Sequence, residues 1–302
     1  MISRAVCGGF RPFIRQQRAL STMEALREKV QSKLASLDHL DPKGKVPLTH
    51  QGFAGRKRFY KHVGVKKIAE NKFGIELDGR TLRTPARNNL HLPTFSLALA
   101  IAAEWDAQTD QRKGIEPVTM PLMTLASTAI DQIAPHPEGT IETVLSYMPT
   151  DSALYFTTEQ DRYLYNKQQT HLLPILSKFN DALQIRVATT QDMSQKISHP
   201  VGVQEKIAFF LSKLDCFTLA AVQSAVKESK SLVLSLSLVG KLASLQEVVL
   251  ASRLEEEVQC EIWGVVEGGH DMDRLNNSVG LSAAHTFTEL LGRTGTIFDG
   301  AK

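Results

Sequence analysis

The chain changes its hydrophobic period once, near Pro93, and this change limits the folds that it can adopt. Before Pro93, short apolar stretches with a period of two are separated by turn residues, as in a small antiparallel sheet. The pair Asp78-Gly79 suits a type I′ hairpin, because both central positions of that turn need a positive φ. We therefore expect an antiparallel β domain at 53–92, with strands at 59–65, 73–77 and 81–83.

After Pro93 the hydrophobic period becomes that of amphipathic helices. The first helix should begin at Thr94 and present one broad apolar face, made by Phe95, Ala98, Leu99, Ala102 and Trp105. Further helices are expected at 121–134, 138–148, 160–182 with a kink at Pro174, 202–213, 215–227, 231–240, 244–263 and 265–275. The predicted fold class is α+β, a small N-terminal antiparallel β domain followed by a larger, mainly α-helical domain at 93–302.

The first 23 residues have the composition of a mitochondrial transit peptide. They contain four arginines, no Asp or Glu, and scattered apolar residues instead of the continuous apolar core of a secretory signal. The whole chain carries a net charge of +3, but without these four arginines 31 basic side chains face 32 acidic ones. We expect mitochondrial import, with a disordered basic tail as the alternative, and then a helical and linker segment at 24–52.

Several protein classes find no support in the sequence. Cys7, Cys216 and Cys260 have no CxxC spacing, so neither a disulfide framework nor a zinc knuckle is indicated. The apolar run at 231–240 is far shorter than the roughly 20 residues that span a bilayer. Local signatures of phosphate loops, zinc peptidases and serine hydrolases are missing, and the run 270–273 (His-Asp-Met-Asp) lacks a second ligand group. We expect no metal, no cofactor and no membrane insertion.

Residues 56–67 interleave basic and aromatic side chains. A single-stranded nucleic acid binds surfaces of this kind, but a sheet edge protected by lysines has the same composition. Because the chain without its leader is not basic, we favour the sheet edge and expect no nucleic-acid partner.

Two carboxylates flank Trp105 in the first helix. Glu104 and Asp106 lie two residues apart and point to different helix faces, so we interpret them as surface charges rather than an acid–base pair. Trp105 itself lies on the apolar face and should pack in the core.

Glu255 is the most unusual carboxylate of the chain. On an ideal helix at 244–263, Val248 and Ile262 lie within about 20° of Glu255. A carboxylate among apolar side chains needs a partner, because burying an unpaired charge is costly. That partner could be an arginine of another helix or a group of a bound protein, and the sequence leaves both open.

Eight short blocks of the sequence carry a further signal through their order. They are 58–61, 78–85, 104–108, 120–122, 128–131, 254–259, 263–264 and 267–271. Taken in this order, they resemble the mitochondrial ATP synthase F(1) complex assembly factor 2 family, whose members are chaperones of the alpha subunit. The resemblance runs from about residue 56 to about residue 271. It departs from the family at Val258, where an aromatic residue is usual, and at Gly268-Gly269, which replace a tryptophan–alanine pair.

The resemblance implies a matrix protein that is not an enzyme and that holds the unassembled alpha subunit until the hexamer of the catalytic head forms. It also implies a functionally important glutamate in the acidic run, for which Glu255 is the best candidate and Glu256 and Glu257 are neighbouring ones. The residues expected to matter are Glu255 and Gln259 for partner binding, and Trp105, Asp131 and Trp263 for structure. A mitochondrial enzyme with a site assembled from distant residues, or an RNA-binding module, are the alternative functions.

Overall fold

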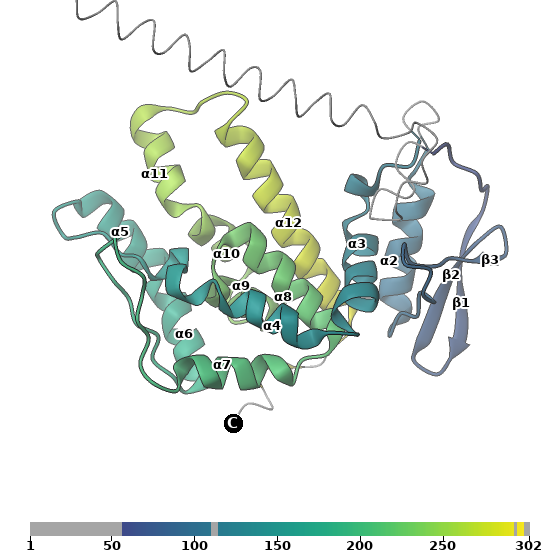
Figure 1. The fold of residues 1–302 in the computed structure, drawn as a ribbon. Coiled ribbons are helices and arrows are strands. Elements are labelled where there is room, and N and C mark those ends of the chain that lie inside the picture. Colours follow the sequence, from purple (N-terminus) through teal and green to yellow (C-terminus); the bar gives the residue numbers. More distant parts are fainter. Residues whose placement is uncertain (1–55, 110–113, 293–294, 299–302) are drawn as a thin grey trace, which may run out of the picture. The chain divides into compact units, whose positions relative to one another are not determined.

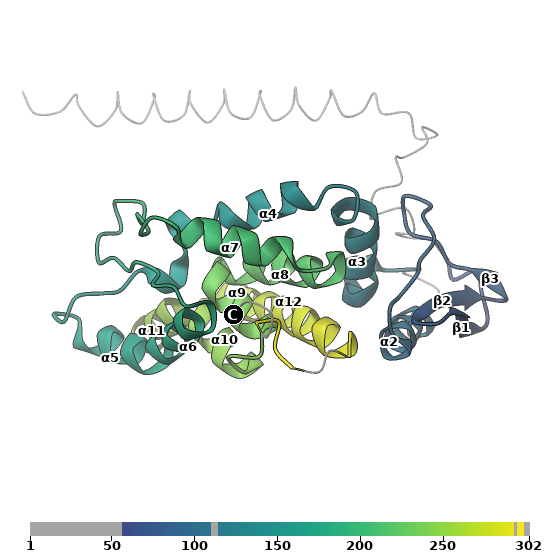
Figure 2. The same cartoon turned by 90° about the horizontal axis from the view of Figure 1, so that it is seen from below.

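The computed structural model describes residues 56–109, 114–292 and 295–298 (Figure 1). The expected transit peptide and the expected helical and linker segment at 24–52 lie outside these residues. The described residues all belong to one compact unit, and the boundary predicted at 92/93 remains a prediction. Figures 1 and 2 show α2 and α3 between the sheet and the remaining helices.

The N-terminal part of this unit is a three-stranded antiparallel sheet with the order β1-β2-β3, which confirms the predicted β architecture. The strands are β1 (Val63–Ala69), β2 (Lys72–Leu77) and β3 (Arg80–Thr81). Leu77 pairs with Arg80 across a turn in which Asp78 and Gly79 have φ values of 49° and 76°, the two positive values that the sequence predicted. Strand β1 lies at an edge with Lys66 and Lys67 exposed, as the sheet-edge interpretation requires.

Helix α2 (Phe95–Asp106) packs against this sheet and begins where the sequence predicted. Thr94 caps it by accepting a hydrogen bond from Leu97 N (3.2 Å) and donates its hydroxyl to Leu290 O (2.6 Å) at the end of the last helix. The predicted apolar face was partly wrong, because Phe95 and Leu99 are exposed. The buried face is made by Leu97, Ala98, Ile101, Ala102 and Trp105, so Leu97 and Ile101 take the places expected for Phe95 and Leu99.

The rest of the unit is helical, as predicted, and its core is built around α9, every residue of which is buried. Asp151 supports α9 by accepting hydrogen bonds from Leu232 N (2.7 Å) and Val233 N (3.1 Å) at its first turn. None of the described helices is both long and apolar enough to cross a membrane. The elements are η1 (Pro117–Thr119), α3 (Pro121–Thr128), the π-helix η2 (Ala129–Ile133), α4 (Pro137–Leu145), η3 (Met148–Thr150), η4 (Ser152–Leu154), α5 (Arg162–His171), α6 (Leu173–Leu183), α7 (Val203–Ser212), α8 (Cys216–Ser229), α9 (Leu232–Val239), α10 (Leu245–Ser252), α11 (Leu254–Trp263) and α12 (His270–Leu290).

Two of the predicted helices were wrong in extent. The single helix expected at 244–263 is broken at Arg253 (φ −121°, ψ 13°), so that α10 and α11 have different axes and Val248 cannot be placed beside Glu255 by helical geometry. The last helix begins at His270 and runs to Leu290, much further than the predicted end at 275. Near Pro174, where a kink within one helix was expected, the structure has two helices, because α5 ends at His171 and α6 begins at Leu173.

Candidate partner-binding site

Helix α11 positions Glu255 in a half-buried place beside α5. The Nε2 atom of Gln168 in α5 lies 3.4 Å from Glu255 Oε1, at the outer limit of a hydrogen bond. Within the described residues no lysine, arginine or histidine forms an ion pair with Glu255. Burial raises the pKa of the Glu255 carboxyl, because leaving water disfavours its charged form.

Gln168 cannot compensate for the missing cation. Its side chain is almost completely buried and already serves the backbone: Oε1 accepts from Thr157 N (2.8 Å) and Nε2 donates to Tyr155 O (3.2 Å). A small cavity of about 170 Å³ lies next to Glu255 and is lined by Gln168, Lys230 and Arg253, among others. Glu255 is therefore a partly desolvated carboxylate that lines a cavity, and its contact with Gln168 at 3.4 Å is a weak hydrogen bond.

The neighbouring glutamates of α11 are neutralised inside the protein. Arg253, which is buried, places Nη2 2.8 Å from Glu256 and Nε 3.5 Å from Glu257. Arg274 of α12 donates to both carboxylate oxygens of Glu257, at 2.9 and 2.5 Å. Arg274 first, and Arg253 after it, lower the pKa of Glu257. Of the three consecutive glutamates, the structure leaves Glu255 alone without a cation among the described residues, so the internal salt bridge considered for it belongs to its neighbours.

Gln259 is exposed and follows Glu255 by four residues, so both side chains lie on one face of α11. Ile262 continues the same face and is exposed as well. The structure thus brings together the two residues that the sequence marked for partner binding, and it adds an apolar neighbour.

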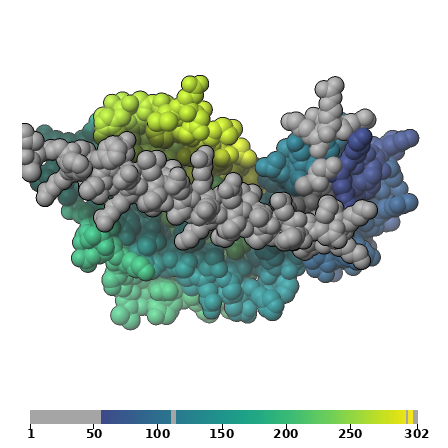
Figure 3. Space-filling view, turned by 45° about the horizontal axis from the view of Figure 1, so that its top comes forward, coloured from purple at the N-terminus to yellow at the C-terminus, as the bar shows by residue number. Residues whose placement is uncertain are grey.

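Exposed apolar side chains gather where α11 ends and α12 begins. Trp263 is 77% exposed and Val266 is 62% exposed; single exposed apolar side chains are ordinary, but several close together in the chain form a group of the kind found at interfaces. We call this group the α11–α12 apolar surface; Figure 3 shows its part of the chain in yellow-green along one edge. It comprises Ile262, Trp263, Val265, Val266, Met272 and Leu275.

The turn that displays this surface is held in a defined shape. Gly264 and Gly268 have φ values of 88° and 75°, which L side chains rarely adopt. Val266 N donates to His270 Nδ1 (3.2 Å), and Cys260 Sγ lies 3.2 Å from the same nitrogen. His270 therefore ties the connection to the end of α11. The described residues contain no group of three or more His, Cys, Asp or Glu side chains that could hold a metal ion.

The three residues expected to be structural lie in different surroundings. Trp105 is 1% exposed, its ring meets Tyr60 edge-on at 5.7 Å, and Tyr60 Oη donates to Trp105 O (2.6 Å). Asp131 accepts hydrogen bonds from Thr84 Oγ1 (2.6 Å), Asn88 Nδ2 (2.8 Å) and Ala86 N (3.0 Å), and so ties η2 to the loop after β3. Trp263, by its exposure, does not support the core as Trp105 does.

Sequence reasoning misjudged Glu104 and missed Gln168. Glu104 is not a solvated surface charge: its carboxylate accepts from Leu122 N and Met123 N, both at 2.8 Å, at the start of α3. No local pattern marks Gln168, which precedes Glu255 by 87 positions. The role of Arg253 was visible in its spacing of three and four residues from Glu256 and Glu257.

An exposed apolar group next to a half-buried carboxylate is typical of the surfaces with which one protein binds another, and chaperones are one class of such proteins. Comparison with known proteins is consistent with this class. A sequence model of the ATP12 chaperone protein family matches residues 57–180. The chain belongs to the ATP12 chaperone family, which is involved in ATP synthase assembly.

The relatives that support this membership span most of the chain. The mitochondrial atp12 protein of Schizosaccharomyces pombe is 27% identical over 80% of this chain and 84% of its own, and the mitochondrial ATP12 protein of Saccharomyces cerevisiae is 24% identical over 72% and 79%. The crystal structure of Atp12 from Paracoccus denitrificans superposes with a TM-score of 0.70 at 29% identity, covering 78% of this chain and 98% of the other. Atu1473 from Agrobacterium tumefaciens, described as a candidate chaperone, gives a TM-score of 0.69 at 30% identity over 78% and 86%.

Proposed function

We propose that this protein binds the unassembled alpha subunit of the mitochondrial ATP synthase and prevents its aggregation until the hexamer of the catalytic head assembles. It acts in the mitochondrial matrix, where the transit-peptide composition of its first 23 residues directs it. It is not an enzyme: binding and release follow from competition between apolar surfaces, with the neighbouring subunit displacing the chaperone.

The α11–α12 apolar surface is the observation that carries this proposal. A subunit that will later be buried in a hexamer exposes apolar surface while it is free, and such surface drives aggregation. Trp263 and Val266 offer a matching apolar surface, and the hydrogen bond from Val266 N to His270 Nδ1 holds the turn that displays them.

Glu255 and Gln259 add specificity to this apolar contact. A half-buried carboxylate without an internal cation is stabilised when a partner supplies a basic or amide group. Because the two side chains share the face of α11 that leads to Ile262, one bound segment can contact all three. We infer that the bound alpha subunit places a hydrogen-bond donor opposite Glu255.

Both alternative functions find less support. Arg58, in the basic segment considered for RNA, is held by Asp106 at 2.8 Å and by the carbonyls of Tyr60 and Lys61 at 3.0 Å, so it is not free to follow a phosphate backbone. A cavity on the β domain is lined by four arginines and one carboxylate, Asp78, to which backbone amides already donate. The lining contains no Ser, Cys, His or Lys, and its one hydroxyl bonded to a carboxylate, Thr84 Oγ1 to Asp131 Oδ1 at 2.6 Å, belongs to the connection between η2 and the loop after β3.

Co-purification from mitochondrial extract tests the proposal. The tagged chain should retain the alpha subunit, identified by mass spectrometry, and should release it when an excess of the neighbouring subunit is added. Recovery of RNA or of a metabolic enzyme complex in place of the alpha subunit would contradict the proposal.

A further inference from the structure

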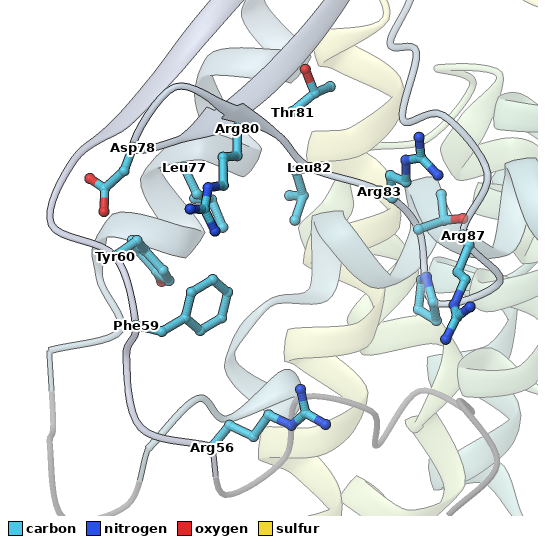
Figure 4. Close-up of a pocket in the computed structure, with 12 residues that line it drawn as sticks. Arg56, Phe59, Tyr60, Leu77, Asp78, Arg80, Thr81, Leu82, Arg83 and Arg87 are labelled. Atoms are coloured by element: carbon cyan, nitrogen blue, oxygen red, sulfur yellow. The ribbon is translucent and has the colours of Figure 1, made fainter. Parts of the chain in front are cut away.

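A second candidate binding site lies on the β domain, away from α11. A cavity of about 580 Å³ opens between the segment before β1, the β2–β3 turn and the loop after β3 (Figure 4). Four arginines line it: Arg56, Arg80, Arg83 and Arg87. Its chemistry is thus dominated by guanidinium groups, which bind carboxylates in a planar, two-pronged geometry.

These four positive charges are not compensated within the described residues. None of the four guanidinium groups takes part in an ion pair or a side-chain hydrogen bond there, although the adjacent Arg58 pairs with Asp106. The one carboxylate in the lining, Asp78, accepts hydrogen bonds from Lys61 N (3.1 Å) and His62 N (2.8 Å). Its oxygens are directed to the backbone, so the cavity keeps a surplus of positive charge that an acidic ligand would neutralise.

Apart from Thr81 and Thr84, the remaining lining is apolar or aromatic and includes an exposed ring. Phe59 is 61% exposed and meets the buried Tyr60 edge-on at a centroid distance of 5.3 Å. Figure 4 shows Phe59 and Arg80 facing the same space, with Leu82 further along the wall. A phosphate ion would satisfy the arginines but leave Phe59 in water, so the lining suits a ligand with both carboxylates and an apolar side chain.

We propose that this arginine-lined cavity binds an acidic peptide segment of a partner protein, in which a large apolar residue is flanked by Asp or Glu. Residues 42–55, which directly precede the cavity's first lining residue, are a poor occupant, because they contain no Asp or Glu. RNA fits less well, because Phe59 is the one exposed aromatic residue in the lining and stacked bases need several. The site is independent of the proposed alpha-subunit contact on α11 and adds a second recognition element to it.

Fluorescence anisotropy of labelled peptides with the full chain tests this site. The probe is a peptide with Phe between pairs of Asp and Glu; the matched peptides carry Asn and Gln in place of the acids, or Ala in place of Phe. The Asn/Gln peptide should bind about tenfold more weakly or worse, and the Ala peptide several-fold more weakly. Labelled single-stranded RNA and inorganic phosphate are the competing ligands.

Variants locate the binding. Arg83→Gln with Arg87→Gln should weaken binding of the acidic peptide by about tenfold, whereas the control Lys66→Gln with Lys67→Gln, on the edge strand outside the cavity, should change it less than about twofold. All four side chains are exposed, so melting temperatures should be unchanged. Equal binding of the acidic and amide peptides, equal losses in both double variants, no binding at all, or displacement by phosphate or RNA at lower concentration than by peptide would each overturn the proposal.

Discussion

Glu255 and Glu257 lie two residues apart in α11, yet their surroundings are electrostatically opposite. Arg274 and Arg253 stabilise the charge of Glu257, whereas burial disfavours the charge of Glu255. A side chain whose charge costs free energy in the isolated protein is expected where a bound partner restores that free energy. The same contrast makes Glu257 unsuitable as a control for Glu255, since its loss would leave Arg274 without its carboxylate and Arg253 with Glu256 alone.

Glu255→Gln should therefore separate binding from stability. The substitution removes a partly desolvated charge and keeps the shape, so the free protein should be as stable as the wild type or slightly more stable at pH 7.5. Capture of the alpha subunit should fall by about tenfold, as for the loss of one charged hydrogen bond. Glu205→Gln, an exposed glutamate in the first turn of α7, is the control and should change neither. Lower stability with unchanged capture would return Glu255 to an internal role.

Glu104 links stability to pH. Burial raises the pKa of its carboxyl to about 7, against the opposing effect of Leu122 N and Met123 N, whereas the unfolded chain titrates near 4.5. The native state thus keeps a proton that the unfolded state loses, and this adds to the free energy of unfolding. The contribution of Glu104 is complete below about pH 4.5 and is lost as the pH rises through about 7.

Urea unfolding of the wild type and of Glu104→Gln at pH 5 and pH 7.5 measures this contribution. Between pH 5 and pH 7.5, the free energy of unfolding of the wild type should fall by about 1 kcal/mol more than that of the variant. The difference is this small because the Glu104 side chain is partly exposed. Parallel changes in both proteins would mean that Glu104 stays ionised as a cap of α3 throughout this range.

At the scale of elements, α2 joins the sheet to the helices. Trp105 packs beneath Tyr60 on its buried face, whereas Leu99 lies on its exposed face. Trp105→Arg should lower the free energy of unfolding by about 3 kcal/mol or more, because it removes a buried ring and introduces an unpaired charge. Leu99→Arg should cost less than about 0.5 kcal/mol. A Trp105 variant with normal thermal stability but no partner binding would place this residue at the interface instead.

Asp131 makes the corresponding connection between η2 and the loop after β3. Asp131→Asn replaces one acceptor oxygen by a donor, so at least one of the bonds from Thr84, Ala86 and Asn88 is lost. We expect a loss of about 1–2 kcal/mol in the free energy of unfolding, measured by urea titration. Asp181→Asn, exposed in α6, should be neutral; equal effects of the two substitutions would contradict the structural role of Asp131.

At the scale of the whole molecule, much of the fold was predictable because its signals are local. The turn at Asp78-Gly79 and the helix start after Pro93 depend on a few adjacent residues, and both were confirmed. The break at Arg253 was missed because no proline or glycine marks it; the residue at the break is an arginine with a buried side chain.

The candidate site was less predictable than the fold. The surroundings of Glu255 depend on Gln168 in another helix, and the exposure of Trp263 depends on how the α11–α12 connection leaves the core. Apolar residues in a sequence look alike whether they fill a core or form a surface for a partner, so periodicity alone could not find the α11–α12 apolar surface.

Aggregation of the alpha subunit, diluted from denaturant and followed by light scattering, tests most directly whether the α11–α12 apolar surface serves as a chaperone surface. An equimolar amount of the wild-type chain should suppress the scattering, and Trp263→Ser with Val266→Ser should lose most of that suppression. The control, Val201→Ser with Phe209→Ser, removes two exposed apolar side chains elsewhere and should suppress scattering as the wild type does. If the wild-type chain leaves the scattering of the alpha subunit unchanged, or if both double variants suppress it equally, the account is contradicted.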